Sequence, residues 1–448
     1  MLSLPRVAVG TVQPEADPAP MIWALVGYLQ QAGRQVQIFH DQARFAHGNH
    51  DLAICGQAPR HLDSWLMSPS LCRQSFVYGS SGSDVSLVVG RFAAARAAVS
   101  RDGGNLEDLC NWLDLPQLAV VDVTQLSNCQ LPPCPAGAAG LLLDRVAEGA
   151  APYWQTLLEA LWGVPVVGSL PEAPALRRHV SPAHIAQESS GGANCGICRH
   201  LGDHLAEHLQ LSKFMKLAAR QEFAPTEPKL FCAGNQLAGV TVAIAYDEAF
   251  NGYFPDVLDL LELHGASVVD FSPLRDEALP PGTDVVYIGC GHPERYAAPL
   301  AANYCMTTAL RNHVRQGRRA YAEGGGMAYL CQTVRLPSGQ HLPMAGVLPA
   351  VAIYDPTEAP PQPAEVTLAR NLWLGPAGFR LSGYLDPSWH LEPAGPLESC
   401  AAEPHSHWRL AARGQAIGSR LQVNFAALPD FIRQFSPAGA HLNPSPVR

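Results

Sequence analysis

The sequence predicts an α/β fold in which two parallel-sheet domains follow one another along the chain. Short apolar segments rich in Val, Ile and Leu alternate with longer helix-like segments, which is typical of parallel strands joined by helical crossovers. With 448 residues, 47% of them hydrophobic and 15% charged, the chain is long enough to form at least two domains with their own cores. Residues 225–236 break the periodicity between two alternating stretches and indicate the domain boundary.

The first stretch contains short segments whose β-branched content predicts strands. These expected strands cover residues 6–12, 35–40, 85–90, 118–123, 139–146 and 164–170. A helix is expected over 21–33, where Gly33 suits a helix C-terminus. A second helix is expected over 201–220, after a stretch rich in Ser, Gly and Asn at 189–194. The predicted first domain therefore covers residues 1–224, and a linker follows at 225–238.

The second stretch, residues 239–437, repeats the α/β pattern. A second α/β unit is expected to open at 239–247 and to continue through 256–273 and 283–291, with a last ordered element within 421–435. A strand at 319–322 runs into a glycine cluster and then into an apolar helical start, which is how many α/β enzymes present a nucleophile. Gly324 stands at that position. Residues 438–448 are expected to form a flexible tail.

Composition and charge exclude several classes of protein. The formal net charge is −9 and no long Lys/Arg cluster occurs, so nucleic acid is not an expected partner. No apolar window is long enough for a membrane-spanning helix, and the first residues lack the apolar region of a signal peptide. Twelve cysteines are scattered without regular spacing, which favours reduced thiols. A cytoplasmic protein without a membrane association is expected.

Several long segments of the chain carry a family resemblance when taken together. They include HLDSWLMS (61–68), GVPVVGSLP (163–171), YDEAFNGYFPDVLDLLELHGASVVDFSPLRDEALP (246–280), GCGHPERYAAPLAAN (289–303) and YAEGGGMAYL (321–330). These segments resemble the cobyrinic acid a,c-diamide synthase family, glutamine-dependent amidoligases that act on corrinoid and sirohydrochlorin-type macrocycles. They occur in the family's order and cover nearly the whole chain. The resemblance implies a P-loop-like domain that activates a macrocycle carboxylate with ATP, followed by a class I glutamine amidotransferase-like domain with a flavodoxin-like fold that supplies ammonia.

The glutaminase motifs of that family are altered here. The family's nucleophile motif is Glu-Cys-Gly-Gly, and the matching residues are Glu323 to Gly326, so Gly324 replaces the catalytic cysteine. The family's LHLHF strand corresponds to residues 421–425, where Gln422 and Asn424 replace both histidines. An amide cannot act as a general base near neutral pH. A third family motif, Gly-His-Glu-Phe-His-Tyr-Ser, corresponds to residues 383–389 and has lost its histidines as well. No catalytic residue is therefore expected in the second domain.

The ATP motifs are altered in a similar way. A P-loop aims backbone N–H groups, a lysine and a hydroxyl at phosphates and magnesium. The matching loop starts at Gly10 and Thr11 and contains three prolines, which lack N–H donors, as well as Glu15 and Asp17. Val89 replaces an acidic magnesium ligand of the family. ATP and magnesium are therefore expected to be lost as cofactors.

The purine contact expected from the family is altered too. The family's base-contacting Asn in its NRV motif becomes Asp144 in DRV here. A carboxylate at this position would change any contact with a purine ring, because it accepts hydrogen bonds and donates none.

Other family segments are retained and include candidates for contact with a macrocycle or a partner. Asp63 and Trp65 lie in HLDSWLMS, and Glu248 and Phe254 lie in the 246–280 segment. An aromatic ring beside an acid suits a flat amphipathic ligand, whereas packing in the core is the alternative reading of these residues. The expected partners are a tetrapyrrole or an active amidoligase, and a homodimer is left open.

A Cys-x-x-Cys segment followed by histidines is not explained by the family. Cys195, Cys198, His200 and His204 have residue types that bind zinc or another soft metal. The alternative is a surface helix with incidental histidines beside two free thiols.

Three functions thus remain open from the sequence. The first is a catalytically silent homologue that acts as a macrocycle-binding, scaffold or regulatory protein. The second is an ATP-dependent ligase that amidates a tetrapyrrole carboxylate with free ammonia. The third is a metal-binding protein centred on Cys195 and Cys198.

Overall fold

The computed structural model describes residues 4–45, 56–92, 103–126, 131–180, 191–219, 229–357, 359–403 and 408–436. The chain divides into two compact units, and each has its own parallel sheet. The first unit contains residues 1–42 and 47–229, and the second contains residues 43–46 and 230–448. The boundary between Lys229 and Leu230 falls inside the segment expected to be a linker. The assignment of residues 43–46 to the second unit has no signal in the sequence.

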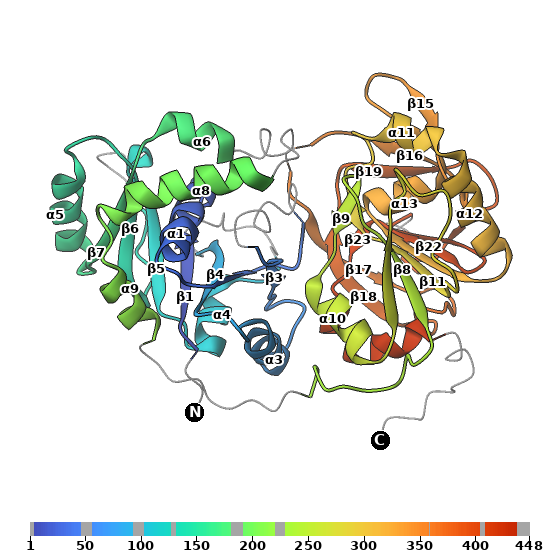
Figure 1. Cartoon of the computed structure of the whole chain (residues 1–448), viewed down its shortest axis with the longest axis horizontal. Helices are drawn as coiled ribbons and strands as arrows, with labels where there is room; N and C mark the ends of the chain where they lie inside the picture. The colour runs from blue at the N-terminus through green and yellow to red at the C-terminus, as the bar shows by residue number, and fades with distance from the viewer. Residues whose placement is uncertain are drawn as a thin grey trace. The chain divides into compact units, whose positions relative to one another are not determined.

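The first unit is built on a seven-stranded sheet with the order β3-β2-β4-β1-β5-β6-β7 (Figure 1). All of its neighbouring strands pair in parallel. The strands are β1 (Arg6–Thr11), β2 (Val36–His40), β3 (Arg60–His61), β4 (Val85–Arg91), β5 (Gln117–Asp122), β6 (Ala138–Val146) and β7 (Val166–Pro171). The six strands expected from β-branched content in this unit are confirmed within a few residues.

Helices cover both faces of this sheet. The helices are α1 (Ala19–Gln31), α3 (Pro69–Gly79), α4 (Leu106–Leu113), α5 (Ala151–Trp162), α6 (Pro174–Val180), α8 (Gly191–Ala206) and α9 (Leu211–Ala218), with a 3₁₀ turn η2 (Val123–Gln125) after β5. Helices α1, α8 and α9 share a core with strand residues such as Val9 and Ile38. Phe39 points to the opposite face, where its ring lies 5.0 Å from Phe76 of α3.

The region expected to be one helix over 201–220 has a different structure. Helix α8 begins at Gly191 and already contains positions 195 and 198, and a short break separates it from α9. The glycine-rich stretch before residue 201 is therefore partly helical. Tertiary packing explains this, since Cys198, Leu201 and Leu205 of α8 are buried in the core shared with α1.

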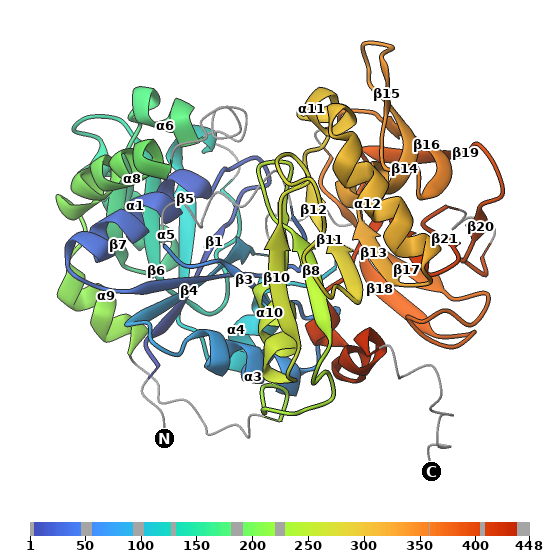
Figure 2. The same ribbon diagram turned by 45° about the vertical axis from the view of Figure 1, so that its right-hand side comes forward.

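The second unit combines a seven-stranded main sheet with smaller sheets (Figure 2). The main sheet has the order β10-β8-β11-β13-β22-β21-β20 and is parallel from β10 to β22. Its strands are β8 (Thr241–Ala245), β10 (Ser267–Phe271), β11 (Val285–Ile288), β13 (Arg319–Glu323), β20 (Glu398–Ser399), β21 (Leu410–Arg413) and β22 (Ala416–Ser419). This confirms a second α/β unit built around a parallel sheet.

Three smaller sheets and several helices complete this unit. The smaller sheets have the orders β12-β9, β15-β14-β16-β19 and β17-β18-β23. Their strands are β9 (Phe250–Gly252), β12 (Cys290–Gly291), β14 (Cys331–Arg335), β15 (His341–Pro343), β16 (Leu348–Tyr354), β17 (Gln362–Thr367), β18 (Arg380–Leu385), β19 (Trp389–Pro393) and β23 (Leu421–Gln422). The helices are α10 (Pro255–Leu263), α11 (Ala297–Ala302), α12 (Tyr304–Arg315), α13 (Gly325–Leu330), η4 (Phe425–Ala427) and η5 (Pro429–Phe435). In the described part of the chain, no helix has the length and apolar character needed to cross a membrane.

Two glycines allow α1 and α8 to cross with their backbones in close contact. A Cβ added at Gly27 of α1 would lie 2.0 Å from the carbonyl oxygen of Cys198. A Cβ added at Gly202 of α8 would lie 2.6 Å from the backbone nitrogen of Tyr28. Because backbone atoms cannot move aside as a flexible side chain can, larger residues would force these helices apart.

We predict that Gly27→Ala lowers the free energy of unfolding by about 1–3 kcal/mol, the usual range for overpacking. The matched control is Gly196→Ala, because a Cβ added at Gly196 in α8 would meet nothing within 4 Å. This control should leave stability unchanged or raise it by about 0.5–1 kcal/mol through better helix propensity. Denaturant unfolding checks both variants, and equal effects would contradict the close crossing.

Candidate active site

The strand-to-helix turn at Gly324 keeps the geometry of a nucleophile elbow. Gly324 has φ 50° and ψ −118°, and it joins the end of β13 to the start of α13. Such a positive φ is strained for residues with a Cβ and is easily adopted by glycine. The Gly324 N–H donates to the carbonyl of Ser419 at 2.8 Å, which fixes the turn against the end of β22.

The next two glycines are required by packing. A Cβ at Gly325 would lie 2.7 Å from the carbonyl oxygen of Gly291, and one at Gly326 would lie 2.5 Å from that of Ile288. Both carbonyls belong to the segment that runs from the end of β11 through β12. The close approach of α13 to this segment therefore holds the elbow in place whatever residue stands at position 324.

The side chains nearest to Gly324 form an acidic and thiol-bearing cluster. A Cβ added at Gly324 would lie 3.3 Å from Sγ of Cys290 and 3.3 Å from Oδ2 of Asp386. These contacts are tight without being forbidden. Space for a Cβ is therefore retained at position 324, and the groups facing it are a cysteine and a carboxyl from elsewhere in the unit.

Glu323, which precedes the elbow, is buried and has a raised pKa. Its Oε1 accepts hydrogen bonds from the Tyr321 hydroxyl at 2.8 Å and from the Val423 N–H at 3.3 Å. Its Oε2 is buried without a hydrogen-bond partner. Burial raises the pKa of Glu323 to about 8, against the opposing effect of those two hydrogen bonds. The carboxyl is therefore mostly protonated at neutral pH.

The same environment keeps the nearby thiol unreactive. Burial raises the pKa of Cys290 well above its usual value, and Glu323 and Asp386 raise it further. Burial also raises the pKa of Asp386, although the N–H of Ser388 stabilises its charged form. Only a thiolate is a good nucleophile, so Cys290 is not poised to replace the missing cysteine at position 324.

The residues at the two altered histidine positions make structural contacts. Oε1 of Gln422 accepts from the Phe45 N–H at 2.7 Å, and Nε2 of Gln422 donates to the Phe45 carbonyl at 3.4 Å. Phe45 belongs to the short 43–46 segment of this unit, and its ring stacks on Phe254 with 4.5 Å between centroids. Oδ1 of Asn424 accepts from the Ala426 N–H at 3.1 Å and so caps η4. Neither amide contacts a reactive thiol.

In the first unit, the loop after β1 is fixed by Gln13. Its Nε2 donates to the Asp122 carbonyl at 2.7 Å, and its Oε1 accepts from the Asp122 N–H at 2.9 Å. Helix α1 then starts behind Pro18 without a side-chain cap, and Oδ1 of Asp17 accepts from the Ala19 N–H at 3.0 Å. The first N–H of the helix is thus engaged by a carboxylate of the chain, and Pro18 and Pro20 have none to offer.

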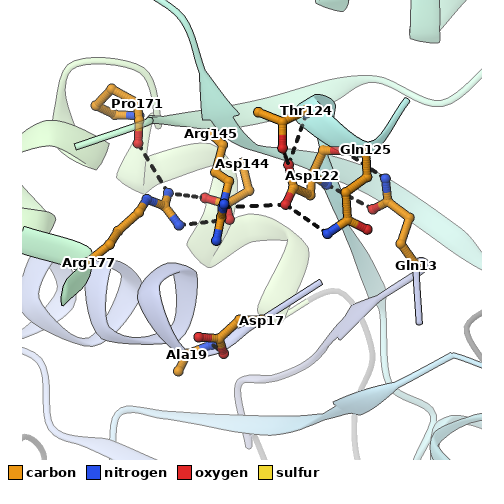
Figure 3. A network of polar contacts seen from close by, with 10 residues as sticks. All are labelled: Gln13, Asp17, Ala19, Asp122, Thr124, Gln125, Asp144, Arg145, Pro171 and Arg177. Atoms are coloured by element: carbon orange, nitrogen blue, oxygen red, sulfur yellow. Dashed lines mark hydrogen bonds and ion pairs between the residues drawn. The ribbon is translucent and has the colours of Figure 1, made fainter. Parts of the chain in front are cut away.

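Charged side chains from neighbouring strand ends pair with each other beside this loop (Figure 3). Oδ1 of Asp122 accepts from the backbone N–H and the hydroxyl of Thr124, and Oδ2 accepts from Gln125 at 3.2 Å. Nε of Arg145 lies 3.4 Å from the same Oδ2.

The second pair in this network is buried. Asp144 forms a two-pronged ion pair with Arg177, which also donates to the Pro171 carbonyl at 3.1 Å. Burial raises the pKa of Asp144, and the hydrogen bond from Arg177 opposes this effect. At the altered purine-contact position, the Asp144 carboxylate is therefore bound to an arginine of the same unit.

Other positions expected around the phosphate loop are part of the core. Val89 pairs with Val9 in the sheet and is buried, and Thr11 is fully buried at the end of β1. A Cβ at Gly10 would lie 2.7 Å from the side chain of Leu106, so this glycine is needed for packing. Packing thus accounts for Gly10 and Val89, whereas the buried hydroxyl of Thr11 has no hydrogen-bond partner among the described residues.

The retained family residues occupy different environments. Oδ1 of buried Asp63 accepts from the N–H groups of Trp65 and Leu66 at 2.8 and 3.1 Å, which stabilises a local turn, and Trp65 is half-buried. Glu248 lies in the second unit, where its exposed carboxylate pairs with Arg275 at 2.6 Å. The hydrogen bond from Arg275 lowers the pKa of Glu248. Phe254 is buried under Phe45, so Glu248 is the most exposed of the four candidates.

The described residues of the metal hypothesis lie in different environments. The side chain of Cys195 lies outside the described part of the chain. Cys198 is buried, and its Sγ lies 3.1 Å from the Trp23 carbonyl, whereas His200 is exposed and faces Asp203. His204 is half-buried one turn further along α8. Within the described ranges, no three His, Cys, Asp or Glu side chains gather as a metal ion would need.

Several residues of these sites carry no motif in the sequence. Asp386 is far from Gly324 along the chain, and only the fold brings the two together. Gln13 and Arg177 also belong to no sequence motif. Gln13 bonds the backbone of Asp122, and Arg177 of α6 pairs with Asp144 of β6. Glu323 had one signal, its place directly before the elbow, but its buried state could not be read from that.

Comparisons with known proteins identify relatives of this chain. A family model described as a CobB/CobQ-like glutamine amidotransferase domain matches residues 241–384. The cobyrinate a,c-diamide synthase of Syntrophotalea carbinolica is 28% identical over 97% of this chain and 98% of its own length. The enzyme of that name from Salmonella typhimurium is 30% identical over 72% of this chain and 73% of its own length. The chain belongs to the cobyrinate a,c-diamide synthase family.

A solved structure described as a glutamine amidotransferase aligns with a TM-score of 0.32 and 17% identity, covering 43% of this chain and 93% of that chain.

The raised pKa of Glu323 predicts that its contribution to stability depends on pH. The folded state keeps this proton up to about pH 8, whereas the unfolded chain releases it near the ordinary pKa of 4.5. The unfolded state thus binds fewer protons between these values, so the stabilisation is complete below pH 4.5 and is lost as pH rises through 8. Glu323→Gln cannot ionise and should gain about 2 kcal/mol relative to the unchanged protein between pH 6 and pH 8.

Denaturant unfolding at the two pH values measures this difference. Glu365→Gln is the matched control, because the Glu365 side chain is 48% exposed and no buried carboxyl is altered. A pH-independent difference for Glu323→Gln would show that Glu323 is ionised in the folded protein.

Proposed function

We propose that this protein acts in tetrapyrrole metabolism as a catalytically silent member of its family, one that binds a macrocycle or an active amidoligase without turning over glutamine or ATP. The observation that carries the proposal is the elbow at Gly324. The turn is intact, while the nucleophile is absent and Gln422 and Asn424 make structural hydrogen bonds. Glutamine hydrolysis needs a thiolate and a base, and neither is provided there.

The loop after β1 supports the same proposal for the nucleotide. Binding of ATP would require N–H groups, a cation and a magnesium ligand at this loop. Gln13 instead joins the loop to Asp122, and Asp17 occupies the Ala19 N–H. Exposed Glu15 and Asp17 add negative charge where phosphates would lie. These contacts favour a protein that has given up ATP and magnesium as cofactors.

The macrocycle part of the proposal rests on family membership. The relatives are named for a reaction on cobyrinate, a corrinoid that carries carboxylates. Trp65 and Glu248 keep some exposure and are the candidates for contact with such a ligand or with a partner enzyme.

Titration of the purified protein with cobyrinic acid and with sirohydrochlorin, each with and without Mg-ATP, tests this function. We expect saturable binding of a macrocycle that Mg-ATP leaves unchanged, and no formation of ADP or amide. Formation of an amide product with added ammonia would contradict the proposal and identify a ligase that uses free ammonia. Absence of macrocycle binding would remove the ligand-binding role.

Restoring the thiol alone should not restore glutaminase activity. Gly324→Cys places a sulfur beside Cys290 and Asp386, but no histidine is present at positions 422 and 424 to accept its proton. Glutamate release from glutamine should therefore stay at background for both the unchanged protein and the variant. Thiol labelling of the unfolded variant verifies the added cysteine. Hydrolysis by either protein would show that another group supplies the base.

A further inference from the structure

Arg145, near the carboxyl end of β6, has a left-handed backbone conformation that is unusual for a residue other than glycine. Its φ is 56°, in the left-handed region, and the pairing of β6 with β7 is irregular between Leu143 and Val146. Such a conformation costs about 1 kcal/mol or more for a residue with a Cβ. Strain of this kind is concentrated at functional sites, so the arginine requires an explanation beyond packing.

The guanidinium of Arg145 lies beside a buried carboxylate. The side chain of Asp122 is 2% exposed and is held by Thr124 and Gln125, and its Oδ2 forms an ion pair with Nε of Arg145 at 3.4 Å without the geometry of a hydrogen bond. The Arg145 side chain itself is 40% exposed. A fixed negative charge on the Nε side restrains the arginine by electrostatic attraction and so favours one orientation of its guanidinium.

The other edge of the guanidinium is open. Among the described residues, neither Nη1 nor Nη2 of Arg145 has a protein acceptor, whereas the guanidinium of Arg177 is occupied by Asp144 and Pro171. Arg145 and Arg177 point into the same network from different elements (Figure 3). Within this network, the Nη1 and Nη2 groups of Arg145 are therefore available to donate hydrogen bonds. Their fork geometry matches that of a carboxylate or phosphate.

The place of Arg145 in the sheet also suits a ligand. Open parallel sheets bind ligands outside the carboxyl ends of their strands, and Asp122 and Arg145 lie at those ends of β5 and β6. The exposed acids Glu15 and Asp17 follow β1 at the same edge and disfavour a highly charged polyphosphate. A single carboxylate meets less repulsion there.

We propose that Arg145 is an oxyanion anchor that binds a peripheral carboxylate of the ligand through Nη1 and Nη2. This inference rests on the proposed function, since the carboxylate-bearing ligand would be the macrocycle. A phosphate group offers the same chemistry from another source. The buried Asp122 holds the anchor in place without taking its outer donors.

The test compares Arg145→Gln with the unchanged protein in titrations with cobyrinic acid and with a corrinoid whose peripheral carboxylates are all amidated. We expect Arg145→Gln to weaken binding of the acid by about tenfold or more and to leave the amidated corrinoid unaffected, because a charged hydrogen-bonded pair is lost only with the acid. Arg145→Lys should recover part of the loss. Arg178→Gln, which removes one exposed positive charge from α6, is the matched control and should bind like the unchanged protein.

Equal weakening for both corrinoids would overturn the anchor and leave the proposed function standing. Binding of neither corrinoid by the unchanged protein would contradict the proposed function instead. In that case, the thermal shift of the protein with inorganic phosphate and with Mg-ATP tests whether Arg145 is an oxyanion anchor. A stabilisation that Arg145→Gln abolishes and Arg178→Gln retains sustains an oxyanion anchor for a phosphate source, and no stabilisation overturns it. Melting of each variant without ligand separates a loss of binding from a loss of folding.

Discussion

Hydrogen bonding between Gln13 and Asp122 is the contact on which the first unit's sheet edge at the carboxyl ends of β1 and β5 depends. The amide of Gln13 bonds both backbone groups of Asp122 and so joins the loop after β1 to the end of β5. The buried N–H and carbonyl groups of Asp122 thus have hydrogen-bond partners within the chain, as buried backbone groups require. The contact also fixes the loop in a shape set by the Gln13 side chain and by prolines.

The second unit follows the same principle by different means. Its elbow is held by close backbone packing at Gly325 and Gly326, so its shape survives a change at Gly324. Burial raises the pKa of Glu323, which precedes the elbow, and of Cys290, which faces it, and so favours the neutral form of both groups. The backbone shape of the elbow therefore does not depend on the presence of a reactive side chain at position 324. Gln422 and Asn424 bond backbone groups, which gives them roles that need no proton transfer.

The sequence predicted the parallel sheets because buried strands such as β1 and β5 are short, apolar and bounded by turn residues. It also located the altered elbow, since the strand and the glycines at 323–326 are contiguous. It could not predict that α8 begins at Gly191, because the packing of Cys198 against α1 outweighs a low local helix propensity. The partners Asp386 for Gly324 and Arg177 for Asp144 come from other elements, and only the fold brings them together.

Titration calorimetry of the full chain with Mg-ATP tests most directly whether internal contacts have replaced the phosphate site. We expect no saturable heat at nucleotide concentrations up to about 1 mM, because a dissociation constant above about 1 mM corresponds to a binding free energy weaker than about 4 kcal/mol. Saturable binding in the micromolar range, with triphosphate seated on the loop between Thr11 and Ala19, would contradict it.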